Sequence, residues 1–167
     1  MLIVLAGLPG TGKTTIAREL APRLVAVHVR IDSIEGAIRR SRPHADVPMD
    51  EAGYMVGYAV AEDNLRLGHT VIADSVNPWP ETRDAWLAVA QRAEVRAVEI
   101  EIVCSDPHEH ERRVRSRDPE PEGARRLTWQ QVLARDYRHW HRDRIVIDTA
   151  RKSVIECVDA ILSAVAQ

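Results

Sequence analysis

The 167-residue sequence lacks phenylalanine, has only two cysteines, and contains no apolar run long enough to span a bilayer. The missing phenylalanine carries no information about chemistry. Cys104 and Cys157 do not have the spacing of metal ligands, so we expect two reduced, structural side chains. The chain starts with an apolar segment and not with the basic segment of a signal peptide. We therefore expect a cytoplasmic protein that does not bind a membrane.

An excess of either charge is also missing. The net charge is −2, so the sequence has no overall basic field for bulk binding of nucleic acid or of an anionic membrane. Hydrophobic residues make up 45% and charged residues 29%, which is typical of a globular protein. This length predicts one domain, residues 1–167, with a single sheet core. Monomer and homodimer both stay open.

The clearest motif is a phosphate-binding loop of the pattern G-x-x-x-x-G-K-[ST]. Its residues are Gly7, Leu8, Pro9, Gly10, Thr11, Gly12, Lys13 and Thr14. An apolar run, residues 2–6, precedes the loop, and a helix pattern starts directly after it at Thr15. Glycines let successive N–H groups point into one concavity, and a helix N-terminus adds partial positive charge there. We expect the segment from Gly7 to Thr15 to bind ATP, with GTP left open. Lys13 would reach the β- and γ-phosphates, and Thr14 would ligate Mg²⁺.

Five apolar segments alternate with helical patterns along the chain. They cover residues 2–6, 25–29, 69–74, 95–103 and 144–149. Strand–helix–strand connections of this kind are right-handed, so we expect an α/β domain whose parallel sheet is covered on both faces. The fourth segment alternates with Arg96, Glu99 and Glu101, so we expect one of its faces to be less buried. Thr128 is expected to cap a helix that continues through Tyr137.

In such sheets ligands bind beyond the carboxyl ends of the strands, so the residues there are the functional candidates. Asp32 follows the second strand, where a carboxylate can take the proton of an acceptor hydroxyl. The alternative is that Asp32 only caps its helix. Glu35, one turn further on, and Arg39 are candidates for binding the acceptor.

Asp74 follows the third strand in a Walker-B-like position, where a carboxylate holds Mg²⁺ directly or through water. The alternative is an aspartate that ends a strand in a turn. Ser75 and Asn77 come next, and either could contact the acceptor. Arg151 follows the fifth strand, beside the expected position of the phosphate-binding loop, and could stack on the nucleotide base.

An arginine-rich segment precedes a break that is rich in proline and glycine. Its arginines are Arg112, Arg113, Arg115 and Arg117, with Arg125 and Arg126 after the break. A charge run of this kind can be a solvated helix face. It also fits a lid, at about residues 112–127, that excludes water and brings guanidinium groups to a transferring phosphoryl group. Arg113 and Arg117 are the preferred catalytic candidates because they are four residues apart on one helical face.

With these motifs, the chain resembles a P-loop kinase of the nucleoside-monophosphate-kinase-like group. More narrowly, it is similar to small bacterial proteins labelled AAA-family ATPases and related to chloramphenicol phosphotransferase, zeta toxin and polynucleotide kinase. The resemblance implies a three-layer P-loop NTPase fold with strand order 2-3-1-4-5. It also implies phosphoryl transfer from Mg·ATP to a hydroxyl, with Asp32 as general base. Zeta toxins and polynucleotide kinases tend to carry an arginine three residues after that acid, where this chain has Glu35.

The sequence thus predicts an ATP-dependent phosphotransferase acting on a hydroxyl of a small metabolite, nucleoside or antibiotic. Two alternatives stay open. One is a polynucleotide 5′-kinase, which would need a basic groove for its strand. The other is a regulatory ATPase that acts on a protein partner.

Overall fold

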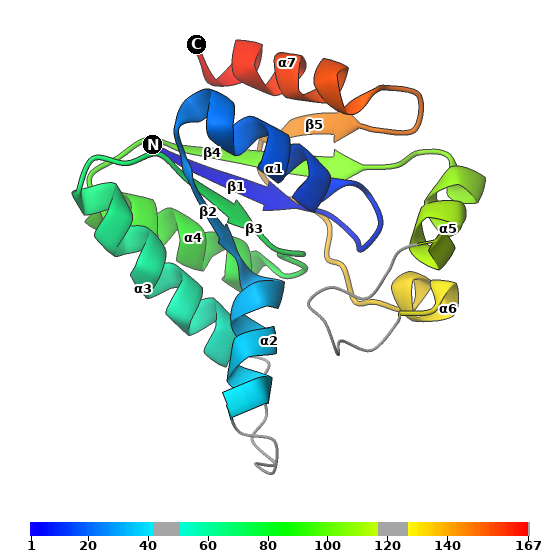
Figure 1. Ribbon diagram of the computed structural model, residues 1–167, viewed down its shortest axis with the longest axis horizontal. Coiled ribbons are helices and arrows are strands. Elements are labelled where there is room, and N and C mark those ends of the chain that lie inside the picture. Colours follow the sequence, from blue (N-terminus) through cyan, green and yellow to red (C-terminus); the bar gives the residue numbers. More distant parts are fainter. Residues whose placement is uncertain (42–50, 117–126, 167) are drawn as a thin grey trace.

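The computed structural model describes residues 1–41, 51–116 and 127–166, and its centre is a five-stranded sheet (Figure 1). The strands are β1 (Leu2–Ala6), β2 (Val27–Arg30), β3 (Val71–Asp74), β4 (Ala97–Val103) and β5 (Ile145–Asp148). All paired strands are parallel, and their order is β2-β3-β1-β4-β5. The predicted α/β fold and strand order are therefore confirmed.

Helices cover both faces of the sheet, which gives three layers (Figure 1). On one face lie α1 (Lys13–Leu24) and α7 (Val154–Val165), and on the other lie α3 (Ala52–Arg66) and α4 (Pro80–Arg92). The shorter helices are α2 (Ile31–Ser41), α5 (Pro107–Ser116) and α6 (Trp129–Leu133). Helices α5 and α6 lie beyond the carboxyl ends of β1 and β4. Among the described residues, no helix is both long and apolar enough to cross a membrane.

Strand β1 is the centre of the core, since all five of its residues are buried. Ile3 and Leu5 pack into the cluster under α1 and α7, whereas Leu2 and Val4 pack into the cluster over α3 and α4. A strand with both faces covered needs a continuous apolar run, and residues 2–6 provide it. The buried strand therefore fixes the position from which the loop after β1 begins.

The second strand begins later than the sequence predicts. Val25 has φ 48°, ends α1 and is 86% exposed, so β2 starts at Val27. Helix α2 then begins directly after β2, at Ile31. Asp32 consequently lies inside the first turn of α2 and does not cap it from outside.

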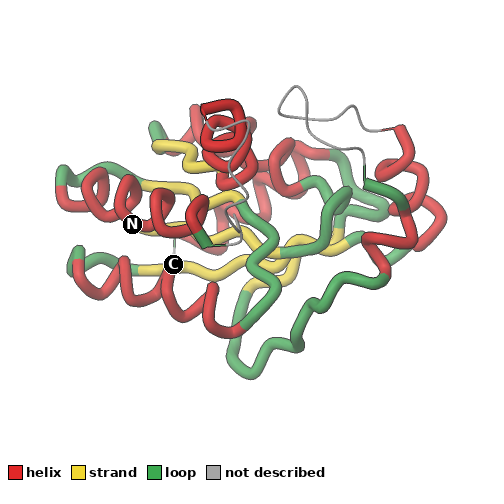
Figure 2. The backbone as a smooth tube through the Cα atoms, turned by 90° about the horizontal axis from the view of Figure 1, so that it is seen from below, coloured by secondary structure: helices red, strands yellow, loops and turns green. Residues whose placement is uncertain are grey.

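The expectation of a less buried face on β4 is wrong. Glu99 and Glu101 are 9% and 8% exposed, because residues 134–144, here the covering segment, lie against them. Arg142 donates to both carboxylate oxygens of Glu99, at 2.6 and 2.7 Å. The predicted helix through Tyr137 is likewise too long: α6 ends at Leu133, and the covering segment is drawn as loop in Figure 2. The polar face of β4 is therefore buried, because an arginine from a distant part of the chain pairs with its glutamate.

The predicted lid is not confirmed. Residues 117–126, which include Arg117, Arg125 and Arg126, lie outside the described residues. The described arginines at the end of α5 are paired with glutamates of the same helix, Arg112 with Glu109 and Arg115 with Glu111.

Candidate functional site

The loop after β1 has the backbone of a phosphate cradle. Gly7, Gly10 and Gly12 have φ angles of 138°, 86° and 102°, a region that favours glycine. A Cβ atom on Gly7 would lie only 2.1 Å from the carbonyl oxygen of Ile102. Helix α1 starts at Lys13, and no side chain caps it at Gly12, so no side chain competes for its first N–H groups. The loop and the helix start together make an anion-binding concavity.

Lys13 lies inside this loop. It is 7% exposed, and its Nζ donates to the carbonyl oxygen of Leu8 at 2.8 Å. The hydroxyl of Thr11 donates to the same oxygen at 2.9 Å. The ammonium group is therefore held against the backbone that would surround a phosphate.

Asp74 lies at the carboxyl end of β3, next to the loop, and is 3% exposed. Burial by itself would raise the pKa of Asp74. Hydrogen bonds from His28 and Thr14, together with the charge of Lys13, outweigh burial and hold the pKa below its usual value. The carboxyl group is therefore ionised at neutral pH, and the predicted pair Thr14 and Asp74 is brought together.

This pair fits a magnesium ion that completes its shell with phosphate oxygens and water. Mg²⁺ commonly takes only one or two protein carboxylates beside a nucleotide. Within residues 1–41, 51–116 and 127–166, no group of three or more His, Cys, Asp or Glu side chains could hold a metal ion.

His28 is a site residue that the sequence did not indicate. Its Nε2 lies 3.1 Å from Oδ2 of Asp74. The signal was available in the alternation of β2, because His28 is two residues before Arg30, which pairs with Asp74 in the sheet register. His28 and Asp74 therefore share one face of neighbouring strands.

The candidate acceptor residues Asp32 and Glu35 lie one turn apart on α2, beyond the end of β2. Asp32 is 49% exposed at its side chain and lies 3.5 Å from Arg30. Glu35 pairs with Arg39 at 3.0 Å and packs against Gly53, where a Cβ atom would lie 2.4 Å from Cγ of Glu35. Burial raises the pKa of Glu35, and the charge of Arg39 offsets only part of this rise.

Tyr54, on α3, adds a largely buried polar group next to Ser75 and Glu35. Its hydroxyl accepts a hydrogen bond from the backbone N–H of Asn77 at 3.2 Å. The side chains of Ser75, which is 5% exposed, and Glu35 interact with it electrostatically. Burial raises the pKa of Tyr54, so the hydroxyl stays protonated.

Asn77 does not fit its predicted contact with the acceptor. Its side chain is completely buried, donates to the carbonyl oxygen of Leu5 at 2.8 Å and accepts from Nε1 of Trp86 at 3.0 Å. Both ends of the amide are thus used inside the protein. We correct its role to that of a residue that holds the loop after β3.

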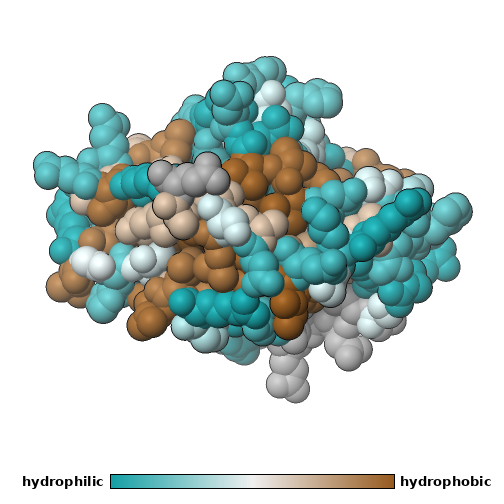
Figure 3. All heavy atoms as spheres, turned by 90° about the horizontal axis from the view of Figure 1, so that it is seen from above, coloured by the Kyte–Doolittle hydropathy of each residue, from teal (hydrophilic) through white to brown (hydrophobic). Residues whose placement is uncertain are grey.

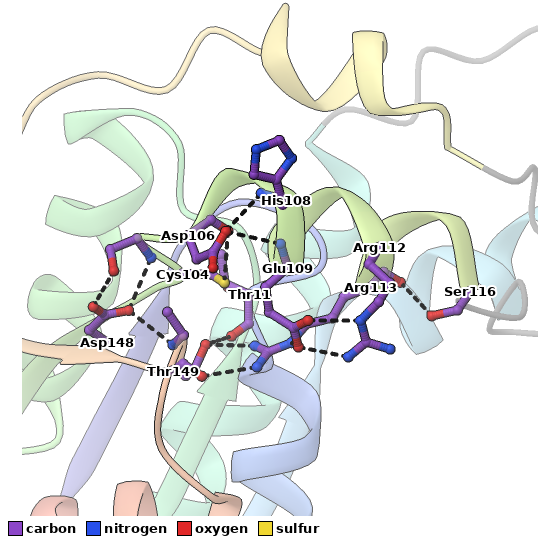
Figure 4. Close-up of polar contacts among 12 residues, drawn as sticks. Thr11, Cys104, Asp106, His108, Glu109, Arg112, Arg113, Ser116, Asp148 and Thr149 are labelled. Atoms are coloured by element: carbon purple, nitrogen blue, oxygen red, sulfur yellow. Dashed lines mark hydrogen bonds and ion pairs between the residues drawn. The ribbon is translucent and has the colours of Figure 1, made fainter.

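The remaining predicted arginines lie apart from the acceptor side. Arg113 donates to Thr149, which in turn contacts the phosphate-binding loop through Thr11 (Figure 4). Arg151 is exposed in the turn after β5. Hydrophilic side chains gather over the end of the molecule that carries α5 (Figure 3).

Residues 2–139 match the family described as "AAA domain". Solved structures with a similar fold include a putative kinase from Chloroflexus aurantiacus, with a TM-score of 0.77 and 19% identity. That match covers 97% of this chain and 96% of the other. The APS kinase CysC of Mycobacterium tuberculosis, in complex with AMPPNP and APS, has a TM-score of 0.74 at 16% identity and covers 99% and 97%.

A third similar structure is Kti12 of Chaetomium thermophilum in complex with ADP-AlF3. It has a TM-score of 0.67 at 23% identity, and the match covers 100% of both chains. At these identities the likeness establishes the fold. A search of curated proteins gave no match.

Proposed function

The chain belongs to this AAA-domain family, and on that premise we propose that it is an ATP-dependent phosphotransferase. It moves the γ-phosphoryl group to a hydroxyl of a small metabolite, nucleoside or antibiotic. The observation that carries the proposal is the placement of two different sites at one edge of the sheet. The phosphate-binding loop with Lys13, Thr14 and Asp74 lies at the ends of β1 and β3, and Asp32 and Glu35 follow the neighbouring β2.

On the donor side, the backbone N–H groups from Gly7 to Thr15 bind the phosphates of ATP, and Lys13 neutralises their charge. Thr14 and Asp74 would hold Mg²⁺, which would neutralise negative charge on the phosphates and so ease the approach of the nucleophile. Arg151, exposed in the turn after β5, stacks on the base of ATP or GTP. Positioning and electrostatics supply most of the rate in reactions of this type.

On the acceptor side, Asp32 accepts the proton of the attacking hydroxyl and orients its oxygen toward the γ-phosphorus. Its exposed side chain at the start of α2 is accessible to a ligand. Glu35, Arg39 and Ser75 bind the rest of the acceptor. The buried Tyr54 hydroxyl faces the same group of residues.

The similar structures support the proposal at the level of the fold. They include a putative kinase and an APS kinase, and the CysC and Kti12 structures are complexes with AMPPNP and ADP-AlF3. Neither the acceptor nor a cytoplasmic location follows from that likeness. We propose both from the site and from the sequence.

The test is label transfer from [γ-³²P]ATP to a panel of sugars, polyols, nucleosides and aminoglycosides. The wild-type protein should give one labelled organic product, and Lys13→Ala should give none, because the β- and γ-phosphates lose their cation. If the protein binds ATP but labels no acceptor in the panel, the proposal of a phosphotransferase is overturned.

The same panel separates the two alternatives. A polynucleotide 5′-kinase would label single-stranded oligonucleotides, with binding that weakens steeply as salt increases. A regulatory ATPase would release only inorganic phosphate, and Asp32→Asn would leave that release unchanged.

A further inference from the structure

Thr149 is a junction between three segments that are far apart in the sequence. It follows β5 directly, is 5% exposed, and its N–H donates to the carbonyl oxygen of Val103 at the end of β4. Its Oγ1 shares its one proton between the carbonyl oxygens of Thr11 and Val103, at 2.9 and 3.0 Å, and accepts from Nη1 of Arg113 at 2.8 Å (Figure 4). The hydroxyl therefore connects α5 with the phosphate-binding loop.

Arg113 is held in place at that hydroxyl by two further directed hydrogen bonds. Its Nη2 donates to the carbonyl oxygen of Thr149 at 2.9 Å, and its Nε donates to Oε1 of Glu109 at 2.8 Å. The guanidinium group is planar, so these bonds fix its orientation as well as its position. Arg113 is 26% exposed at its side chain, whereas Arg112 and Arg115 are 67% and 71% exposed.

Helix α5 touches the loop at a second point. Nε2 of His110 donates to the carbonyl oxygen of Pro9 at 2.8 Å, and His110 is 6% exposed. Val114 packs so closely against Gly10 that a Cβ atom there would lie 2.6 Å from its Cγ2. The helix thus holds two carbonyl groups of the loop, those of Pro9 and Thr11, directly and through Thr149.

Holding these carbonyls has a consequence for phosphate binding. A peptide unit is planar and trans, so its C=O and its N–H point in opposite directions. The unit that carries the Pro9 carbonyl also carries the N–H of Gly10, and the Thr11 carbonyl shares a unit with the N–H of Gly12. Glycine would otherwise let these units rotate. Fixing each oxygen therefore fixes the direction of an N–H group in the cradle.

We propose that α5 sets the phosphate-binding loop through a relay from Arg113 to Thr149 to Thr11, with His110 as a second anchor. Arg113 and Thr149 are then positioning residues for nucleotide binding. The relay rests on the proposed function only in that the loop binds a nucleoside triphosphate. It differs from the catalytic role predicted for Arg113, since it places the effect in nucleotide affinity and not in the transfer step.

The first test compares three variants by titration with ATPγS in the presence of Mg²⁺. Thr149→Val keeps the shape of the side chain but removes the hydroxyl, and should weaken ATPγS binding by about 10-fold. Thr149→Ser restores the hydroxyl and should bind within about twofold of the wild type, because the relay depends on that oxygen. Thr82→Val is the matched control: its hydroxyl donates to the carbonyl of Trp79 at 2.9 Å on α4, away from the loop. It should leave ATPγS affinity unchanged.

The second test is a double-mutant cycle. Arg113→Lys keeps the positive charge but loses the planar guanidinium group that makes several hydrogen bonds at once. It should also weaken ATPγS binding by about 10-fold. Combined with Thr149→Val, it should add little, because both changes break one relay. The Arg113→Lys variant alone still tests the relay if Thr149→Val folds poorly.

Wild-type affinity in folded Thr149→Val, or equally weak binding by Thr149→Ser, would overturn the relay. So would Arg113→Lys that lowers the transfer rate with ATPγS affinity intact. A wild-type protein that does not bind ATPγS would overturn the nucleotide site itself, and with it the proposed function.

Discussion

Asn77 holds the loop after β3 from inside the fold. Its side chain joins the carbonyl of Leu5 to the indole of Trp86, and its own carbonyl accepts from Nε of Arg83 at 2.9 Å. Asn77→Ala leaves both partners of the amide buried without a hydrogen bond and places alanine at φ 47°. We expect a loss of about 3 kcal/mol in the free energy of unfolding, measured in urea. ATPγS affinity should persist in the folded fraction, and a variant as stable as the wild type would contradict the structural role.

The partly buried carboxyl group of Glu35 predicts that the stability of the protein falls as pH increases. Burial raises its pKa above the ordinary value of 4.5, with Asp32 adding to the rise and Arg39 and Arg135 opposing it. Just above that pH the native state binds more protons than the unfolded state, so this residue lowers stability as pH increases. Glu35→Gln should therefore melt at a higher temperature than the wild type at pH 7.5. The difference should vanish near pH 4.

Glu62 provides the matched control for this measurement. Its hydrogen bond from Arg92 lowers its pKa, so Glu62→Gln should lower the melting temperature at pH 7.5. Equal melting temperatures for wild type and Glu35→Gln at pH 7.5 would contradict a burial cost at Glu35. Such a cost at a site residue is expected where function opposes stability.

At the scale of elements, ion pairs hold the covering segment against β4. Arg142 forms two hydrogen bonds with the buried Glu99 and also pairs with Asp84. Arg142→Met leaves the Glu99 carboxylate without its partner and should cost about 2 kcal/mol in urea unfolding. Arg142→Met combined with Glu99→Met should recover most of that loss, because no buried charge then remains. A double variant no more stable than Arg142→Met would contradict this account.

The elements that the sequence predicts well are those with local signals. The apolar run of β1 and the motif after it fix the start of the sheet. Ser153 begins α7 with a capping box that includes Glu156, and Gly68, at φ 87°, follows α3. Each signal needs only neighbouring residues, so each can be read without the fold.

The covering segment could not be predicted in this way. Its irregular backbone is held by Glu99, Glu101 and Arg83, which lie 36 to 55 positions before their partners in the chain. Hydrogen bonds and ion pairs over such separations leave no periodic pattern in the sequence. The role of Asn77 could not be predicted either. A polar residue after a strand gives the same sequence pattern whether its side chain faces a ligand or the core.

For the whole molecule, the strand order brings the proposed donor and acceptor sites together. Strand β3 lies between β1, which carries the phosphate-binding loop, and β2, which leads into Asp32 and Glu35. The nucleotide site could be predicted from the sequence because the backbone of the phosphate-binding loop requires glycines at fixed positions. The proposed acceptor site could not be predicted in this way. It combines α2, Tyr54 of α3 and Ser75 after β3, and the shape of these side chains would decide its specificity.

The most direct measurement is the partition of the γ-phosphoryl group between acceptor and water, using the acceptor found in the panel. The wild-type protein should place most of the label on the acceptor. Asp32→Asn should lower that transfer by about 10²- to 10⁴-fold while ATPγS still binds, because only the proton acceptor is lost. Label found solely in inorganic phosphate, at a rate that Asp32→Asn leaves unchanged, would contradict phosphoryl transfer to a hydroxyl.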